Sequence, residues 1–199
     1  MWAASQIRFN APLRLGEIAV KRSEIASITE KSGKSGRLVF VNLCHTILNA
    51  ADEVAIKEEQ NIVYTEAPKL SAIPPPRPAP AGATWRRNLI PDPVLLFRYS
   101  ALTFNPHRIH YDLPYCTGVE GYPGLVVHGP LIATLMVDLC RRSRPDVEIK
   151  EFSFRAMSPL FVDHAMVLGG APADDGSSAA VWAANHEGGL ASQGEVNFA

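Results

Sequence analysis

The stretch TFNPHRIHYD, residues 103–112, places two imidazoles three positions apart, His107 and His110. Asn105 stands just before them and Asp112 just after. An imidazole has a pKa near 6.5, so it can accept or donate a proton at neutral pH. The stretch is therefore a candidate for general acid–base chemistry. Taken alone, a turn with two histidines is more often a hydrogen-bonded cap, and we interpret Asp112 as a turn or cap residue rather than an acid.

A second segment, GYPGLVVHGPL, follows the histidines and leads into the apolar run GPLIATLMVDLCRR, residues 129–142. Leu131, Leu135 and Leu139 recur every four residues, which predicts a helix with one buried face. The first turn of a helix has free backbone N–H groups and the positive end of the helix dipole. The start of this helix, at Gly129, could therefore stabilise a negatively charged oxygen.

The other histidines show no comparable pattern. We interpret His45, His164 and His186 as structural. His107 and His110 have no third ligand at a suitable spacing, so we expect no metal site.

Composition limits the class of protein. The chain has 199 residues with a formal net charge of −1, so nothing in its overall charge favours nucleic acid or anionic lipid. No apolar run approaches the roughly 20 residues of a membrane span. Three widely spaced cysteines favour reduced thiols in a cytoplasmic compartment. No signal peptide is recognisable, and in a eukaryote the mitochondrial matrix remains an alternative.

A proline-rich segment divides the chain. Residues 67–83 contain six of the sixteen prolines, which prevents a regular helix or inner strand. We therefore predict a strand-only first part at residues 1–67, a linker at 68–84 and a second domain at 85–199.

The first part reads as a small antiparallel sheet. Two β-rich runs, at 24–30 and 38–47, flank the turn KSGKSG and predict a hairpin. A third run is QNIVYTEA, and IRFNAPLRLGE supplies a short strand and a turn at Gly16. No long helix accompanies them, so something else must cover the apolar face.

The second part reads as a helix with a sheet around it. We predict a strand at 94–102, the polar histidine turn, the helix at 129–142, and three further strands, with Asp174-Asp175-Gly176 marking the last turn. An antiparallel sheet could wrap around the single helix.

This order of elements, with GYPGLVVHGPL and FSFRAMSPLFVD, resembles the second half of MaoC-like acyl-CoA hydratases and dehydratases, and within them the itaconyl- and mesaconyl-CoA hydratase branch. The resemblance is close from Phe97 to about Asp163. It implies an α+β double hot-dog fold with an incomplete first half, whose helix would lie upstream. It also implies one continuous sheet, and the exposed edges of that sheet favour a homodimer.

The hydratase motif of that family is Asp-x-Asn-Pro-hydrophobic-His. When its His is aligned with His110, Asn105 occupies the acid position and His107 the Asn position. Aligning the Asn-Pro pair with Asn105-Pro106 instead would put Arg108 where the His belongs, and we reject that register. The resemblance then implies that His110 is the base. Asn105 would hold the water or fix the tautomer of His110, and His107 would take over part of the acid's work.

The resemblance also implies an oxyanion donor and a substrate pocket. The Gly129 N–H would face the thioester oxygen, and His128 is expected to be a packed, hydrogen-bonded side chain rather than a second base. The other candidate substrate-binding residues are Tyr99, Tyr122 and Val127 beside the acyl group, and Arg98 and Arg108 at the CoA phosphates.

The implied function is the reversible hydration of an enoyl-CoA thioester whose acyl group is small and either branched or dicarboxylic, of the itaconyl or mesaconyl type. CoA is part of the substrate, and no separate cofactor is expected. Two alternatives remain open: a hot-dog thioesterase, and a module that binds acyl groups without catalysis.

Overall fold

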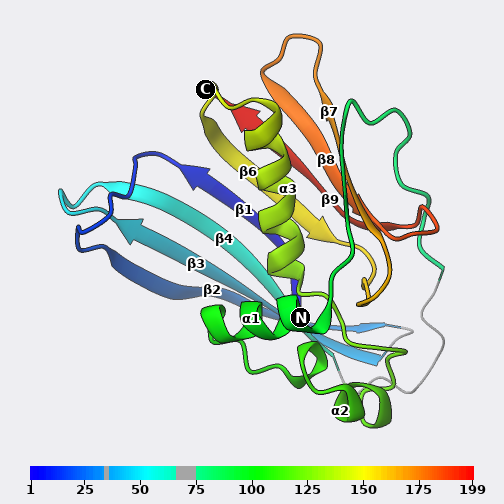
Figure 1. Ribbon diagram of the computed structural model, residues 1–199. Coiled ribbons are helices and arrows are strands. Elements are labelled where there is room, and N and C mark those ends of the chain that lie inside the picture. The colour runs from blue at the N-terminus through cyan, green and yellow to red at the C-terminus, as the bar shows by residue number, and fades with distance from the viewer. Residues whose placement is uncertain (34–35, 66–74) are drawn as a thin grey trace.

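In the computed structural model, which describes residues 1–33, 36–65 and 75–199, nine strands form one antiparallel sheet. The strand order is β2-β3-β4-β1-β6-β9-β8-β7-β5 (Figure 1). The strands are β1 (Trp2–Phe9), β2 (Val20–Gly33), β3 (Gly36–Leu48), β4 (Val54–Thr65), β5 (Trp85–Leu89), β6 (Ile149–Ala156), β7 (Met166–Pro172), β8 (Ser178–Ala184) and β9 (Leu190–Phe198). The helices are α1 (Pro93–Thr103), a 3-10 turn (Arg108–His110), α2 (Leu113–Gly118) and α3 (Gly129–Ser143).

The N-terminal strands form the predicted hairpin. β2 and β3 pair from Val20↔Leu48 to Gly33↔Gly36, and the central residues of the predicted turn, 34–35, lie outside the described residues. β4 begins at Val54, six positions before the predicted run. Gly16 has a φ of 85°, as its predicted turn requires.

Pairing between β1 and β6 joins the two parts of the sheet. Its register runs from Ala4↔Arg155 to Arg8↔Glu151, so the predicted continuous sheet is confirmed. At the end of this junction the ring of Trp2 meets that of Phe154 edge to face, with centroids 4.6 Å apart.

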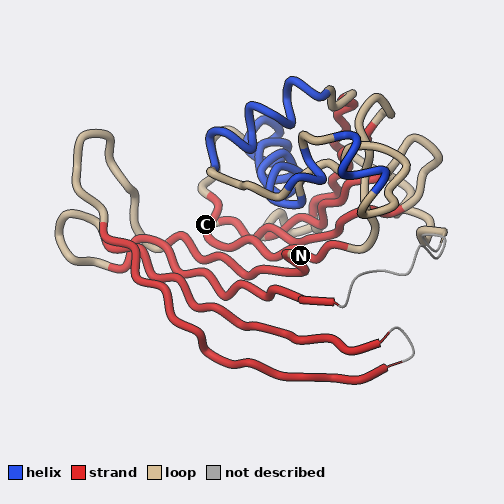
Figure 2. Tube along the Cα trace, turned by 90° about the horizontal axis from the view of Figure 1, so that it is seen from below, coloured by secondary structure: helices blue, strands red, loops and turns tan. Residues whose placement is uncertain are grey.

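Helix α3 packs against the C-terminal strands, which curve around it (Figure 1). Its buried face includes Leu131, Met136 and Leu139. The approach is close at Gly194 in β9, where an added Cβ would lie 3.2 Å from Cε of Met136. The helices lie over one face of this half, whereas no described helix covers β2 and β3 (Figure 2). Ile25 and Ile28 of β2 are accordingly exposed.

The predicted strand at 94–102 is wrong, because these residues form α1. Asp92 caps this helix by accepting a hydrogen bond from the Leu95 N–H at 2.7 Å, and Pro93 occupies its first turn. A cap followed by proline is a helix start signal, whereas the short apolar run by itself fits a strand or a helix equally well.

The predicted set of C-terminal strands also needs correction. Four strands follow α3 rather than three, because the last predicted run contains both β8 and β9. The turn at 174–176 therefore joins β7 to β8, and the last turn lies at 185–189. Strand β5 and helix α2 were not predicted. Each is short and has no distinct periodicity, so tertiary pairing and capping decide them.

The proline-rich segment lies partly outside the described residues, at 66–74. Residues 75–84 contain only an isolated bridge between Pro78 and Gly189. The division into a partial first domain, linker and second domain stays a prediction. All three cysteines are free. None of the described helices is long and apolar enough to cross a membrane.

Candidate active site

His110 ends the 3-10 turn and lies almost fully inside the protein, with 7% of its surface exposed. Its Nδ1 is 2.7 Å from the carbonyl oxygen of Val126. A carbonyl only accepts hydrogen bonds, so Nδ1 must carry the proton. The lone pair of the neutral ring is therefore on Nε2, which has no hydrogen-bond partner among the described residues. This is the arrangement that a general base needs.

The segment before α3 holds that carbonyl in place. The Val126 N–H donates to the Ile109 carbonyl at 3.0 Å, and the Val127 N–H donates to the Leu160 carbonyl at 2.8 Å. The first bond ties residue 126 to the 3-10 turn, and the second ties residue 127 to the segment that holds Leu160.

His128 lies flat against His110. The two ring centroids are 3.7 Å apart and the planes differ by 19°. His128 is 0% exposed, and its Nε2 forms a 2.8 Å hydrogen bond with Oγ of the buried Ser100 in α1. Its Nδ1 is buried with no hydrogen-bond partner in the described part of the chain. The expectation of a packed, hydrogen-bonded His128 agrees with this geometry.

Burial keeps both rings neutral. It lowers the pKa of His110 to about 4, although the bond to Val126 opposes the shift, and the neighbouring His107 lowers it further. Burial lowers the pKa of His128 to about 3, helped by the charges of His110 and His107. Since a positive charge on one ring would lie directly over the other, the stack favours two neutral imidazoles at neutral pH.

Gly129 begins α3 immediately after His128. Its backbone N–H has no hydrogen-bond partner among the described residues, as expected of the first helical position. A Cβ added here would meet only the Trp2 carbonyl oxygen, at 4.0 Å. The position thus combines a free donor, the positive end of a 15-residue helix and open space beside the backbone.

The structure does not connect Asn105 to His110 by a hydrogen bond. Oδ1 of Asn105 accepts a hydrogen bond from the backbone N–H of His107 at 3.1 Å. The backbone N–H of Asn105 donates to the Ser100 carbonyl. The Val126 carbonyl, not Asn105, fixes the tautomer of His110. His107 is exposed, and its ring meets that of His110 edge to face with centroids 5.5 Å apart.

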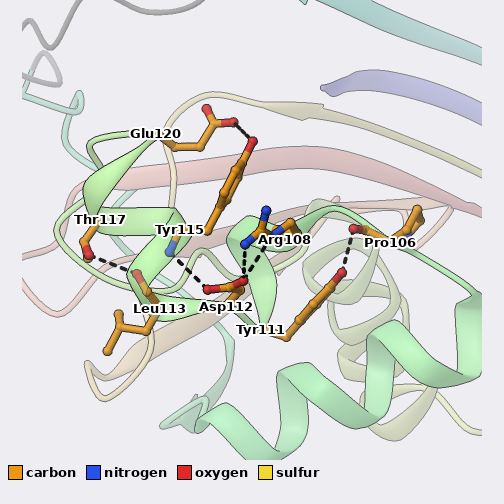
Figure 3. Close-up of polar contacts among 8 residues, drawn as sticks. All are labelled: Pro106, Arg108, Tyr111, Asp112, Leu113, Tyr115, Thr117 and Glu120. Atoms are coloured by element: carbon orange, nitrogen blue, oxygen red, sulfur yellow. Dashed lines mark hydrogen bonds and ion pairs between the residues drawn. The ribbon is translucent and has the colours of Figure 1, made fainter.

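Arg108 lies in a polar cluster with Asp112, Tyr115 and Glu120 at α2 (Figure 3). Its guanidinium bonds Asp112 at 2.6 Å and lies 4.0 Å above the centroid of the Tyr115 ring. Asp112 also caps α2 by accepting the Tyr115 N–H at 3.0 Å. Asp112 is thus a capping residue, as expected, and its hold on Arg108 weakens the prediction that Arg108 meets CoA.

Of the remaining predicted substrate residues, only Tyr99 has a ring contact with the histidine pair among the described residues. Tyr99 is half-buried, with its ring 4.9 Å from that of His128. Val127 is 3% exposed, and its side chain belongs to the hydrophobic core. Tyr122 is half-buried, 6.2 Å from the ring of Phe161. Arg98 is exposed on α1. The roles of these residues in binding stay predictions.

The other histidines lie apart from this cluster. His45 bonds Ser23 in the β2–β3 hairpin, and His164 stacks on His186 with centroids 4.7 Å apart. Among the described residues no three metal-binding side chains come together.

Sequence reasoning missed Ser100. Once residues 93–103 are recognised as a helix, Leu96 and Ser100 lie one turn apart on its buried face. The signal that could have revealed this is the Asp-Pro pair at Asp92-Pro93.

The chain resembles curated proteins that are longer. It is 50% identical to Mesaconyl-C(4)-CoA hydratase of Chloroflexus aurantiacus over 166 residues, 81% of this chain and 57% of that protein. It is 30% identical to the mitochondrial Hydroxyacyl-thioester dehydratase type 2 of Schizosaccharomyces pombe, over 83% of this chain and 62% of that protein. The chain thus spans less than two thirds of each.

Solved structures share the fold at low sequence identity. The peroxisomal multifunctional enzyme type 2 of Drosophila melanogaster matches all of this chain and 37% of its own, with a TM-score of 0.79 and 13% identity. A Mycobacterium tuberculosis protein described as having a double hot-dog fold matches all of this chain and 75% of its own, with a TM-score of 0.63 and 13% identity. These likenesses support the α+β double hot-dog fold.

The sequence profile of one family, Htd2, matches residues 1–162. That span includes His110, His128 and the start of α3, and it agrees with the relatives above. The chain therefore belongs to the hydroxyacyl-thioester dehydratase type 2 family, within the MaoC-like hot-dog dehydratases.

Proposed function

We propose that the protein adds water to, and removes it from, an α,β-unsaturated acyl-CoA thioester. The observation that carries the proposal is the His110 imidazole, whose Nδ1–H is committed to Val126 while Nε2 is free. Such a ring is a neutral base at physiological pH, because burial lowers its pKa to about 4. The family membership supports the same hydro-lyase reaction.

In the hydration direction, Nε2 of His110 takes a proton from water while the water oxygen bonds to the β-carbon of the substrate. The electron pair of the double bond moves toward the thioester carbonyl. The resulting enolate is then protonated at the α-carbon, and His110 can return the proton that it took. One O–H bond and the π bond of the C=C double bond break, and one C–O and one C–H bond form. The reaction is therefore redox-neutral, and we propose no cofactor, since CoA is part of the substrate.

Gly129 would stabilise the negative charge on the thioester oxygen. Its free N–H is the donor, and donors of this kind are often worth about 10²–10³ in rate. The open space beside it would let the thioester approach. Asn105 cannot ionise, and we assign it the weaker role of holding the water near His110.

The acyl group is a further proposal. The relative from Chloroflexus aurantiacus is named for mesaconyl-C(4)-CoA, and the family resemblance places the half-buried Tyr99 and Tyr122 beside the acyl group. We therefore favour a small branched or dicarboxylic acyl chain. Strands β2 and β5 are the two edges of the sheet, and unpaired edges support the proposal of a homodimer. The free cysteines support the proposed cytoplasmic location.

The test follows the ultraviolet absorbance of the enoyl thioester with mesaconyl-, itaconyl- and crotonyl-CoA, alongside a free-thiol assay. Loss of absorbance without thiol release supports the proposal. Thiol release would make the protein a thioesterase. His45→Ala serves as a matched control for His110→Ala, because His45 is buried in β3 away from the stack.

One observation favours a second candidate, a module that binds acyl groups without catalysis. Asn105 replaces the family acid, and no carboxylate in the described part of the chain hydrogen-bonds to His110. Binding of crotonyl-CoA measured by calorimetry, without turnover of any of the three esters, would support this alternative.

A further inference from the structure

Ser100 lies on the buried face of α1 and contacts the histidine pair through a hydrogen bond to His128. It is 6% exposed, and its hydroxyl is the single hydrogen-bond partner of the His128 ring among the described residues. The other nitrogen of that ring, Nδ1, is buried and unpartnered. The orientation of His128 therefore depends on Ser100 and on the stack with His110.

His110 is held in two ways. The Val126 carbonyl fixes one point of the ring, its Nδ1. A single hydrogen bond leaves the ring free to turn about it, and the flat face of His128 at 3.7 Å removes that freedom. The direction of Nε2, the proposed base, is thus set by Val126 and His128 together.

We propose that Ser100 is a positioning residue for the base: its hydroxyl holds the ring of His128, and His128 holds the plane of His110. The kinetic part of its test, the change in kcat and KM, rests on the proposed function. Its structural readout, the titration of the two imidazoles, is independent of any activity.

Loss of the hydroxyl would leave both nitrogens of His128 buried without a partner. Buried polar groups rarely stay unpaired, so the ring would turn or admit water. Either change weakens the desolvation that lowers the pKa of His128. The other titratable groups facing the stack are His107 beside the 3-10 turn and Tyr99 on α1, and among the described residues no carboxylate contacts either ring.

The experiment compares Ser100→Ala, Ser100→Cys and Ser100→Thr by NMR titration of the histidine ring protons and by kcat and KM over pH. Alanine removes the hydroxyl. Cysteine keeps the size but is a weak hydrogen-bonding group, whereas threonine keeps the hydroxyl. Ser192→Ala is the matched control, because Ser192 is equally buried, at 3% exposed, in β9.

We expect Ser100→Ala and Ser100→Cys to raise the pKa of His128 toward its ordinary value and to lower kcat about tenfold with little change in KM, as a displaced catalytic group does. Ser100→Thr should titrate like the unaltered protein. In a His128→Phe background, Ser100→Ala should have no further effect on the titration of His110.

Two results would overturn the proposal. In one, Ser100→Ala titrates like Ser192→Ala. In the other, Ser100→Cys behaves normally while Ser100→Thr does not, which would mean that only the volume matters. Absence of turnover in the unaltered protein would count against the proposed function instead, and the titrations would still decide the role of Ser100.

Discussion

The imidazole of His110 stacks on that of His128 with ring centroids 3.7 Å apart and planes within 19°. One ring is tied to a backbone carbonyl and the other to a serine hydroxyl, so each is fixed by a different element. Because positive charges on both rings would repel each other at this distance, the pair can hold at most one proton readily. The site is therefore built to receive a proton, which is the first step in adding water to a double bond.

Replacing His110 by alanine should lower turnover at least ~10²-fold, the usual contribution of a general acid–base group. Rates with mesaconyl-CoA and thermal melts of the variant measure the effect and check the fold. His45→Ala should keep its rate. A near-normal rate in His110→Ala would remove this residue from the mechanism.

Asn105→Asp restores the carboxylate of the family motif. A carboxylate oxygen can accept the His107 N–H as Oδ1 of Asn105 does now, so the loop should keep its conformation. We expect activity to be preserved or raised if this position handles the water. Steady-state kinetics on the variant decide the matter, and complete loss of turnover would show that the amide has its own role.

The protonation of His110 should not change kcat/KM near neutral pH. The ring must be neutral to accept a proton, and its pKa is lowered to about 4. The rate should therefore fall only as the pH drops toward that value, by about tenfold per unit below it. An acid limb near the ordinary histidine pKa would mean that His110 is hydrated in the working enzyme.

The sequence was sufficient to single out His110, whose role as the base stays a prediction, and to predict α3. The first stands in a recognisable family motif and the second is a clear helical stripe. The sequence was not sufficient for α1, whose apolar run fits a strand equally well, and this error concealed Ser100. The stack itself joins residues 18 positions apart through a loop without periodicity. Local patterns cannot reveal such a contact, since it depends on the β-bridge between Val126 and Phe161 and on the packing around it.

Gly129→Ala tests whether the thioester must approach the N–H of residue 129 closely, and it should not disturb the fold. Alanine suits the first turn of a helix, and the added methyl would meet only the Trp2 carbonyl at 4.0 Å. Stability should be unchanged or slightly higher. Turnover should fall about tenfold, since alanine keeps the N–H donor but its methyl occupies space that the thioester needs in order to reach that donor. Gly118→Ala, which has open space around it, is the control, and equal rates in the two variants would count against the assignment.

The two buried histidines should also make stability depend on pH. Above the unfolded-state value near 6.5 neither state binds protons at these rings, so they add no pH dependence. Below it the unfolded chain takes up protons, whereas the folded rings stay neutral down to about 4 for His110 and about 3 for His128. The free energy of unfolding should therefore fall as the pH drops from 6.5 to 4.5, by about 1.4 kcal/mol per unit for each ring.

Urea denaturation at pH 7, 6 and 5 measures that slope, in a window above the titration of carboxyls such as Asp112, whose pKa is lowered by the Tyr115 N–H and by Arg108. His128→Phe keeps a flat ring against His110 but cannot bind a proton in either state. Its slope should be smaller than that of the unaltered protein by the contribution of one ring, whatever its stability at pH 7. Equal slopes would mean that His128 takes up protons in the folded state, and the neutral stack would then have to be abandoned.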